Sequence, residues 1–167
     1  MGSFAIMEGY VPGALDRVVL LHGSYYHEQW GFGAFFETKV ATELSAFLTS
    51  YKAGRDGFWT VSQDGQVEGS IAIDGTNAAG SGAHLRWFIV SDSLRGKGAG
   101  GRLLRTAMEF CRGREYPSVH LWTFGGLEAS RHLYEREGFQ LMEEHTGTTW
   151  GTEVLEQRFE CVLPPTS

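Results

Sequence analysis

The residues best suited to chemistry lie in one stretch, which runs from an apolar strand through a glycine-rich turn into a helix. The strand is predicted over residues 84–90, and the turn is residues 95–101, RGKGAGG. Apolar side chains then recur at helical spacing at positions 103, 104, 107, 108 and 111. Glycines let a ligand approach the backbone closely, and the unpaired N–H groups of a first helical turn point toward an anion. The stretch therefore predicts an anion-binding site.

Three kinds of glycine-rich loop compete for this signal, and spacing separates them. A Walker loop is excluded, because no Gly-Lys-Ser/Thr occurs at the required spacing. Gly96, Gly98 and Gly101 match the dinucleotide pattern G-x-G-x-x-G. In a dinucleotide-binding fold, however, that loop directly follows its strand, and an acidic residue occurs ~20 positions later. Here residues 91–95 intervene, and the next predicted strand, 119–124, ends without an acid. An oxidoreductase is therefore only the third alternative.

The remaining pattern, R-x-x-G-x-G, begins at Arg95. It resembles the pyrophosphate loop of the GCN5-related N-acetyltransferases, the GNAT family. The resemblance implies that acetyl-CoA is the co-substrate, with its diphosphate on the amides of residues 96–101 and its pantetheine beside the preceding strand. The implied contacts are Phe88, Ile89, Val90, Arg95, Gly96, Lys97, Gly98, Ala99, Gly100 and Gly101.

A second signature follows in residues 128–139, where Leu-Tyr is followed by Gly-Phe. It resembles the family helix whose tyrosine, here Tyr134, contacts the sulfur of acetyl-CoA. Gly125-Gly126 stand where the family favours an asparagine, which puts the cofactor contacts there in doubt. The diagnostic resemblance covers residues 84–142.

More loosely, residues 22–36 and Trp150-Gly151 resemble the acetyltransferase domains that elsewhere are fused to winged-helix regulators of the MarR type. We expect the domain to stand alone here. Residues 1–167 are interpreted as a single N-acetyltransferase domain, with residues 1–10 and 164–167 as tails.

Tyr134 is the candidate for stabilising the departing thiolate. A phenol has a reference pKa of about 10 and a thiol about 8.5, so complete proton donation is uphill by about 2 kcal/mol. We therefore expect a hydrogen bond to the sulfur, with full transfer only where the site lowers the pKa of the tyrosine. The alternative is a core tyrosine on an amphipathic helix.

His84 is the candidate general base, because by resemblance it occupies the place of the catalytic glutamate in the histone-type members. Histidine is mostly neutral at pH 7 and can accept a proton. Strand alternation predicts Arg86 and Phe88 on the same face as His84. A solvated strand end is the alternative, and His22, His27 and Glu28 are other base candidates. The histidines show no zinc-ligand spacing.

The acceptor is expected between residues 22–36 and the loop around 146–152, both of which are aromatic. The predicted acceptor is a small amine with a carboxylate or an aromatic group, rather than a protein tail. A structural ion pair of Arg86 with Glu8 or Glu37, and a core role for the aromatic side chains, are the alternatives. The predicted acceptor-binding residues are Arg86, Tyr25, Trp30 and Trp150.

Composition sets further limits. The chain of 167 residues is 42% hydrophobic, which suits one globular domain. Fourteen basic against 20 acidic side chains give a net charge of −6, which argues against nucleic acid as a partner. The absence of a long apolar run or a secretory signal predicts a cytoplasmic protein without a membrane partner. Cys111 and Cys161 are predicted to be buried free thiols.

The predicted fold is α/β (α+β), with a mixed, largely antiparallel sheet of six to seven strands and helices on both faces, as in the GNAT family. The last strand is predicted to bury Leu155, Gln157 and Phe159 and to expose Glu156. No element is assigned to residues 1–10. The other predicted elements are strand 18–21, helix 25–30, a helix from about 34 that Gly54 stops, hairpin strands 58–61 and 67–73, strand 84–90, a helix after 101, strand 119–124, a helix within the signature 128–139 and a strand before the last one.

The leading function is therefore transfer of an acetyl group from acetyl-CoA to a primary amine, by direct attack in a ternary complex. The alternative is a catalytically weak CoA-binding sensor or interaction module of the same fold. The sequence leaves room for a homodimer.

Overall fold

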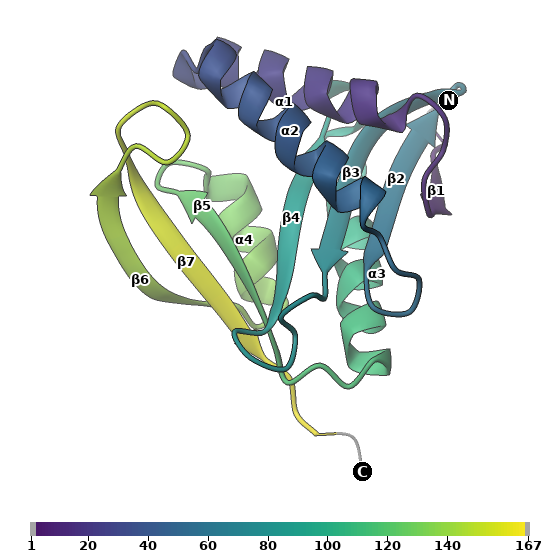
Figure 1. Ribbon diagram of the computed structural model, residues 1–167. Coiled ribbons are helices and arrows are strands. Elements are labelled where there is room, and N and C mark those ends of the chain that lie inside the picture. The colour runs from purple at the N-terminus through teal and green to yellow at the C-terminus, as the bar shows by residue number, and fades with distance from the viewer. Residues whose placement is uncertain (1–2, 166–167) are drawn as a thin grey trace.

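A seven-stranded sheet in the order β1-β2-β3-β4-β5-β7-β6 forms the middle layer of the computed structural model, which describes residues 3–165 (Figure 1). Neighbouring strands are antiparallel, except that β4 and β5 are parallel. The strands are β1 (Ala5–Glu8), β2 (Gly57–Gln63), β3 (Gln66–Asp74), β4 (Ala83–Val90), β5 (Ser118–Phe124), β6 (Gln140–Gly147) and β7 (Val154–Val162).

Helices cover both faces of this sheet, so the predicted architecture is confirmed. On one face, α1 (Ala14–Trp30) and α2 (Ala34–Thr49) enclose a core with β2, β3 and β4. On the other, α3 (Ala99–Gly113) and α4 (Glu128–Arg136) pack over a second core that includes both buried free cysteines, as predicted. A short 3-10 turn, η1 (Asp92–Leu94), precedes the glycine-rich turn. Among the described residues, no helix combines the length and the hydropathy needed to cross a bilayer.

The predicted strand 18–21 is wrong, because these residues lie inside α1. Ala14, Val18 and His22 recur every four residues and are all buried, whereas Leu20 is about half exposed. Gly23 does not end the helix. It lies against the Glu37 side chain of α2, where a Cβ atom would collide. Helical spacing over 17 residues thus overrides the β-branched run.

The first strand instead lies among residues that were interpreted as a tail. β1 pairs with β2 from Ala5↔Ser62 to Glu8↔Trp59, at one edge of the sheet. Residues 163–165 form no strand or helix, and residues 166–167, the rest of the other predicted tail, lie outside the described chain.

The middle of β4 carries a bulge that reverses its alternation. Trp87 has a left-handed φ of 49°, and the pairing with β3 shifts register between Ser70 and Ala72. Ser70 Oγ donates a 2.7 Å hydrogen bond to the Trp87 carbonyl and so holds the bulge. Arg86 therefore contacts α2, whereas Phe88 packs toward α4. The prediction that Arg86 and Phe88 share a face is wrong.

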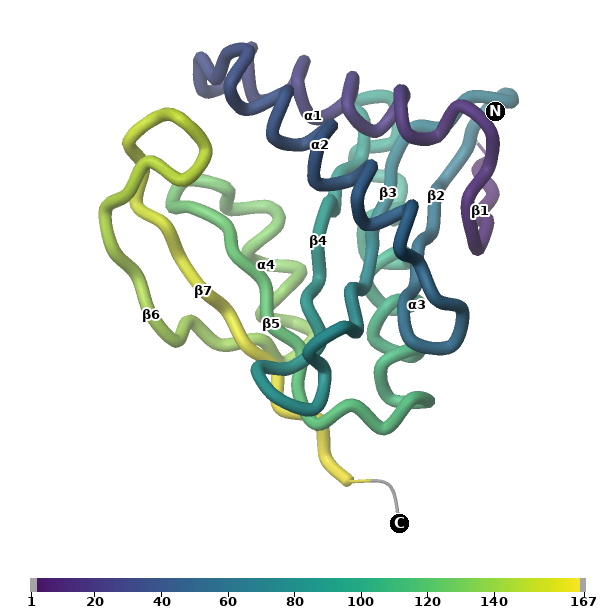
Figure 2. Tube along the Cα trace, viewed as in Figure 1, coloured from purple at the N-terminus to yellow at the C-terminus, as the bar shows by residue number. Residues whose placement is uncertain are grey.

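β4 and β5 separate just beyond their first residues. Among the described residues they pair only at Ala83↔Val119 and His84↔His120, and Figure 2 shows them close at one end and apart at the other. Both strands therefore leave backbone groups without a partner along the gap. Such a gap can take up a ligand that forms hydrogen bonds with a strand.

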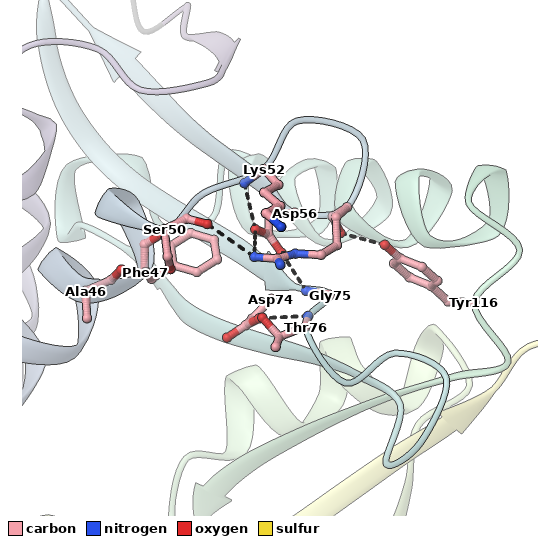
Figure 3. Close-up of polar contacts among 10 residues, drawn as sticks. Ala46, Phe47, Ser50, Lys52, Asp56, Asp74, Gly75, Thr76 and Tyr116 are labelled. Carbon is pink, nitrogen blue, oxygen red and sulfur yellow. Dashed lines mark hydrogen bonds and ion pairs between the residues drawn. The ribbon is translucent and has the colours of Figure 1, made fainter.

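A buried carboxylate ties together the two loops at the closed end of this gap (Figure 3). Asp56 accepts hydrogen bonds from the backbone N–H groups of Lys52 (2.9 Å) and Gly75 (2.8 Å) and from the guanidinium of Arg55. Tyr116 Oη donates to the Arg55 carbonyl (2.6 Å). Burial raises the pKa of Asp56, but the hydrogen bonds and the charge of Arg55 outweigh it, and the net pKa is lowered.

Candidate active site

A cavity of about 870 Å³ lies beside the glycine-rich turn, and we call it the loop cavity. The end of β4, the starts of α3 and α4, and Tyr25 of α1 line it. Of the ten residues predicted to contact the cofactor, nine line this cavity: Phe88, Ile89, Val90, Arg95, Gly96, Gly98, Ala99, Gly100 and Gly101. Lys97 does not line it and is exposed.

The backbone N–H groups at this turn are free to bind an anion. Residues 96 and 98–101 donate no hydrogen bond to any acceptor within residues 3–165, whereas Arg102 donates to the Gly98 carbonyl (3.1 Å). Gly98 precedes α3 with φ 83°, and no protein atom lies within 4 Å of the position of an added Cβ. The free amides at the N-terminus of a 15-residue helix form an anion cradle that fits a diphosphate.

Arg95 and Tyr25 flank the cradle. The Arg95 guanidinium lies 4.6 Å from the centre of the Tyr25 ring, and its Nε is 2.9 Å from Oδ1 of the exposed Asp92. Tyr25 was predicted to bind the acceptor, but the structure places it against the loop cavity instead. α1 begins at Ala14, 11 residues before the predicted helix 25–30, and its last turns bring Tyr25 to the cradle.

A second cavity, of about 460 Å³, opens along the separation of β4 and β5, and we call it the gap cavity. Side chains of α1, α2, α4, β4, β5, β6 and β7 line it. Tyr26 and Phe88 line both cavities, so the two meet at these rings. Tyr26 is partly buried and contacts Phe36 and Phe124, so it forms part of the boundary between the cavities.

Tyr134 lines the gap cavity. Its ring packs against Phe88, Phe139 and Phe159, and its hydroxyl has no hydrogen-bond partner within residues 3–165. Burial, with a smaller contribution from Tyr26, raises the pKa of Tyr134 far above its ordinary value. The phenol therefore keeps its proton and can donate a hydrogen bond into the cavity.

His84 lies where β4 and β5 still pair, and it lines the gap cavity. Its ring stacks on His120 with centroids 4.6 Å apart. Burial, and then the charges of Arg86, His120 and Arg158, lower the pKa of His84 to about 3. His84 is neutral at pH 7, as a base must be, but it binds a proton only weakly.

The other base candidates separate into two groups. His22 lines the gap cavity, and burial lowers its pKa to about 4, although its bond to the Val18 carbonyl opposes this. His27 and Glu28 line neither cavity, and His27 Nδ1 lies 2.9 Å from the Phe32 carbonyl. Because they line neither cavity, His27 and Glu28 lie outside the candidate site.

Arg86, which was predicted to bind the acceptor, lines the gap cavity, and its ion-pair partner is Glu43 of α2 rather than Glu8 or Glu37. Its guanidinium also lies 4.2 Å from the centre of the Trp87 ring. Lys39 Nζ contacts the other oxygen of Glu43 at 2.6 Å. Sequence reasoning missed Lys39 and Glu43, because on a helix they follow the pattern of an ordinary solvated ion pair.

The predicted aromatic residues divide in a similar way. Trp150 lines the gap cavity and contacts Phe124. Trp30 lines neither cavity. It packs edge-on against Phe124 and over Gly126, where a Cβ atom would collide with the ring. Trp30 is therefore structural. Its ring leaves no room for a side chain at position 126, which accounts for a glycine there.

Glu156 was predicted to be exposed, but only 3% of its surface is accessible. It lines the gap cavity and accepts hydrogen bonds from Thr149 N and Thr149 Oγ1, both 2.8 Å. Leu155, predicted to be buried, is 42% exposed. The loop between β6 and β7 folds over this face of the strand, so alternation alone could not locate it.

The chain has clear relatives. The sequence model of the acetyltransferase (GNAT) family matches residues 16–139. N-acetyltransferase 8 of Rattus norvegicus is 32% identical over 129 residues, which cover 74% of this chain and 58% of the relative. The chain spans between 46% and 60% of the length of the curated relatives that it matches.

Solved structures share the fold over nearly the whole chain. A GNAT-family acetyltransferase of Staphylococcus aureus Mu50 has a TM-score of 0.76 at 15% identity, covering 97% of this chain and 100% of the other. The ribosomal-protein-alanine N-acetyltransferase of Brucella melitensis has a TM-score of 0.74 at 16% identity, covering 95% and 99%. With the family match over most of its length and the motifs at residues 95–101 and 128–139, the chain belongs to the GNAT family of acetyltransferases.

Proposed function

We propose that the protein transfers an acetyl group from acetyl-CoA to a primary amine of a small molecule, by direct attack in a ternary complex. The observation that carries the proposal is the meeting of the two cavities at Phe88 and Tyr26, beside the free hydroxyl of Tyr134. One cavity offers an anion cradle and the other has charged and aromatic walls. A donor and an acceptor could therefore occupy the protein together.

The loop cavity suits acetyl-CoA, which supplies the activated acetyl thioester when bound. The free amides of residues 96 and 98–101 would hold its diphosphate, and Arg95 would add positive charge. The unpaired edge of β4 over residues 87–90 would hydrogen-bond the pantetheine amides. These contacts would direct the thioester end toward Phe88 and Tyr134.

Tyr134 would donate a hydrogen bond to the sulfur as negative charge develops there. Because its pKa is raised rather than lowered, full proton transfer to the thiolate is less favourable than for a free phenol. The structure of the site thus favours the hydrogen-bonding role over the proton-donating role.

His84 would accept a hydrogen bond from the bound acceptor molecule. A group with a pKa of about 3 cannot hold a proton from an ammonium group, whose reference pKa is near 10, except transiently. We therefore assign His84 a positioning role and let water carry the proton away.

A small-molecule acceptor suits the gap cavity, whose volume lies in the range of small-ligand sites. A fold neighbour is named for acetylating a ribosomal-protein alanine, so peptide amines belong in the test. The assay is thiol release from acetyl-CoA, with mass detection of the product, over amino acids, aryl amines, polyamines and lysine peptides. Acetylation of small amines above peptides supports the proposal. Binding of CoA without acetylation of any amine would favour the sensor alternative.

A further inference from the structure

One wall of the gap cavity carries excess positive charge. Lys39 and Glu43 of α2 and Arg86 of β4 all line the cavity. The Glu43 carboxylate contacts both cations, through Oε2 to Lys39 (2.6 Å) and through Oε1 to Arg86. Two cations share one carboxylate, so the group has a net charge of +1. The Arg86 side chain is 24% exposed and donates only one hydrogen bond within the described chain, which leaves N–H groups for a ligand.

The opposite wall carries negative charge. Glu156 of β7 is registered against Phe124 of β5. Figure 1 shows β7 beyond β5, on the other side of the separation between β4 and β5. Its carboxylate is nearly fully buried and lines the cavity. Thr149 donates two hydrogen bonds to it, and His145 Nε2 lies 3.4 Å away. A carboxylate can accept about four hydrogen bonds, so it keeps capacity for an ammonium group.

Two histidines of the cavity, His22 and His84, do not change this polarity. His22 and His84 are neutral at pH 7, because burial lowers their pKa values to about 4 and 3. Aromatic rings of Phe36, Trp122 and Trp150 line the space between the charged walls. Opposite charges held apart in a partly buried cavity interact more strongly with a ligand than they would in water.

We propose that the acceptor is a zwitterion, an α-amino acid or a close relative, whose ammonium group binds Glu156 and whose carboxylate binds the Arg86–Lys39 wall. This inference rests on the proposed acetyltransferase function and narrows its substrate class. Glu156 is then a specificity-determining residue on β7, and Glu43 positions both cations. A simple amine satisfies one wall only, and a lysine side chain within a peptide carries no adjacent carboxylate.

The first test uses the unaltered protein and ligands that differ by one charged group. Phenylalanine, tryptophan, leucine and methionine are each compared with the decarboxylated amine as acceptor and with the α-hydroxy acid as competitive inhibitor. We expect kcat/KM for the amino acids to exceed that for the amines by about 10- to 100-fold, as expected for hydrogen bonds to a charged group. Amines that are acetylated as well as amino acids across the panel would overturn the proposal.

The second test separates the two walls by substitution. Glu156→Gln should lower kcat/KM for amino acids by about 10- to 100-fold and leave inhibition by the hydroxy acids unchanged, because these lack the ammonium group. Arg86→Gln should weaken the binding of the amino acids and of the hydroxy acids, but not the binding of the amines. If Glu156→Gln weakened the binding of amino acids, amines and hydroxy acids equally, Glu156 would serve only to anchor the loop. That result would overturn its role in binding the ammonium group.

Charge-matched controls lie outside the cavity. Glu144→Gln, on β6, removes a carboxylate that contacts Gln157 (3.1 Å), and Arg17→Gln removes a cation paired with Glu68 (2.9 Å). Both should keep the kinetics of the unaltered protein. Affinity for CoA and the melting temperature report whether each variant is folded. Acetylation of peptides or simple amines without any amino acid would refute this inference while sustaining the acetyltransferase function, whereas no acetylation at all would refute that function.

Discussion

Gly98 offers a sharp test of the anion cradle, because the chain contains a matched control. Gly98 precedes α3 with φ 83° and ψ 2°, and Gly13 precedes α1 with φ 86° and ψ −9°. In both cases no protein atom lies within 4 Å of an added Cβ. Replacement by alanine should therefore cost both sites the same steric penalty of the left-handed region, about 1–2 kcal/mol of stability.

Only Gly98→Ala should weaken the binding of CoA. Its Cβ would project into the open space beside the free amides, where the diphosphate is expected. Displacing one charge-assisted hydrogen bond costs about 1.5–3 kcal/mol, which lowers affinity about 10- to 150-fold. Gly13 lines neither cavity, so Gly13→Ala should bind CoA normally.

The assay is isothermal titration of CoA into the two variants and the unaltered protein, with thermal unfolding of each. We expect melting temperatures that fall together, by about 2–8 °C for a chain of this size. Equal CoA affinity in the two variants would refute the cradle. A much larger loss of stability in Gly98→Ala alone would refute the steric equivalence on which the comparison depends.

Three further predictions concern single side chains. Tyr134→Phe keeps the ring packing and should lower kcat about 10- to 100-fold, while the affinity for CoA stays within about twofold. An unchanged kcat would refute the proposed hydrogen bond from Tyr134 to the sulfur. Asp56→Asn leaves one buried backbone N–H of Lys52 or Gly75 without an acceptor and should cost about 1–3 kcal/mol at pH 7 by urea unfolding. Because the folded pKa of Asp56 is lowered, its contribution is present above pH ~4 and lost as the pH falls through that pKa, so the two proteins should converge in acid. His22 and His84 also have lowered pKa values in the folded state, so their contribution to stability is present above pH ~6.5 and is lost as the pH falls toward about 4 and about 3. The free energy of unfolding should fall by up to about 1.4 kcal/mol per pH unit for each histidine. His84→Asn should make this dependence on pH less steep, and an unchanged dependence would contradict the burial of His84 as a neutral ring.

The parts of the fold that local pattern controls could be predicted from the sequence. The glycine-rich turn, the hairpin of β2 and β3, and the strand and helix that follow α3 each carry their own signal within a dozen residues. α1 could not be recognised from the run 18–21, because its helical spacing appears only when residues 14–30 are taken together. β1 is only four residues long, and its pairing with β2 depends on partners some 50 residues away.

The same distinction between local signals and tertiary contacts decides which parts of the candidate site could be predicted. The cradle at residues 95–101 is local, and all of its predicted residues but Lys97 line the loop cavity. The gap cavity is built from seven elements, and its charged walls depend on tertiary contacts. The bulge at Trp87 turns Phe88 away from the face of Arg86, and the β6–β7 loop covers Glu156. Neither event leaves a mark in the spacing of side chains along the sequence.

The central claim is that this chain binds acetyl-CoA in the loop cavity and acetylates an amine in the gap cavity. Mass spectrometry of the acceptor, with simultaneous measurement of released thiol, tests it most directly. We predict one N-acetyl group on the amine for each thiol released, and loss of both signals together in Gly98→Ala at limiting acetyl-CoA. Tight CoA binding with no acetylated product over the whole amine panel would contradict it.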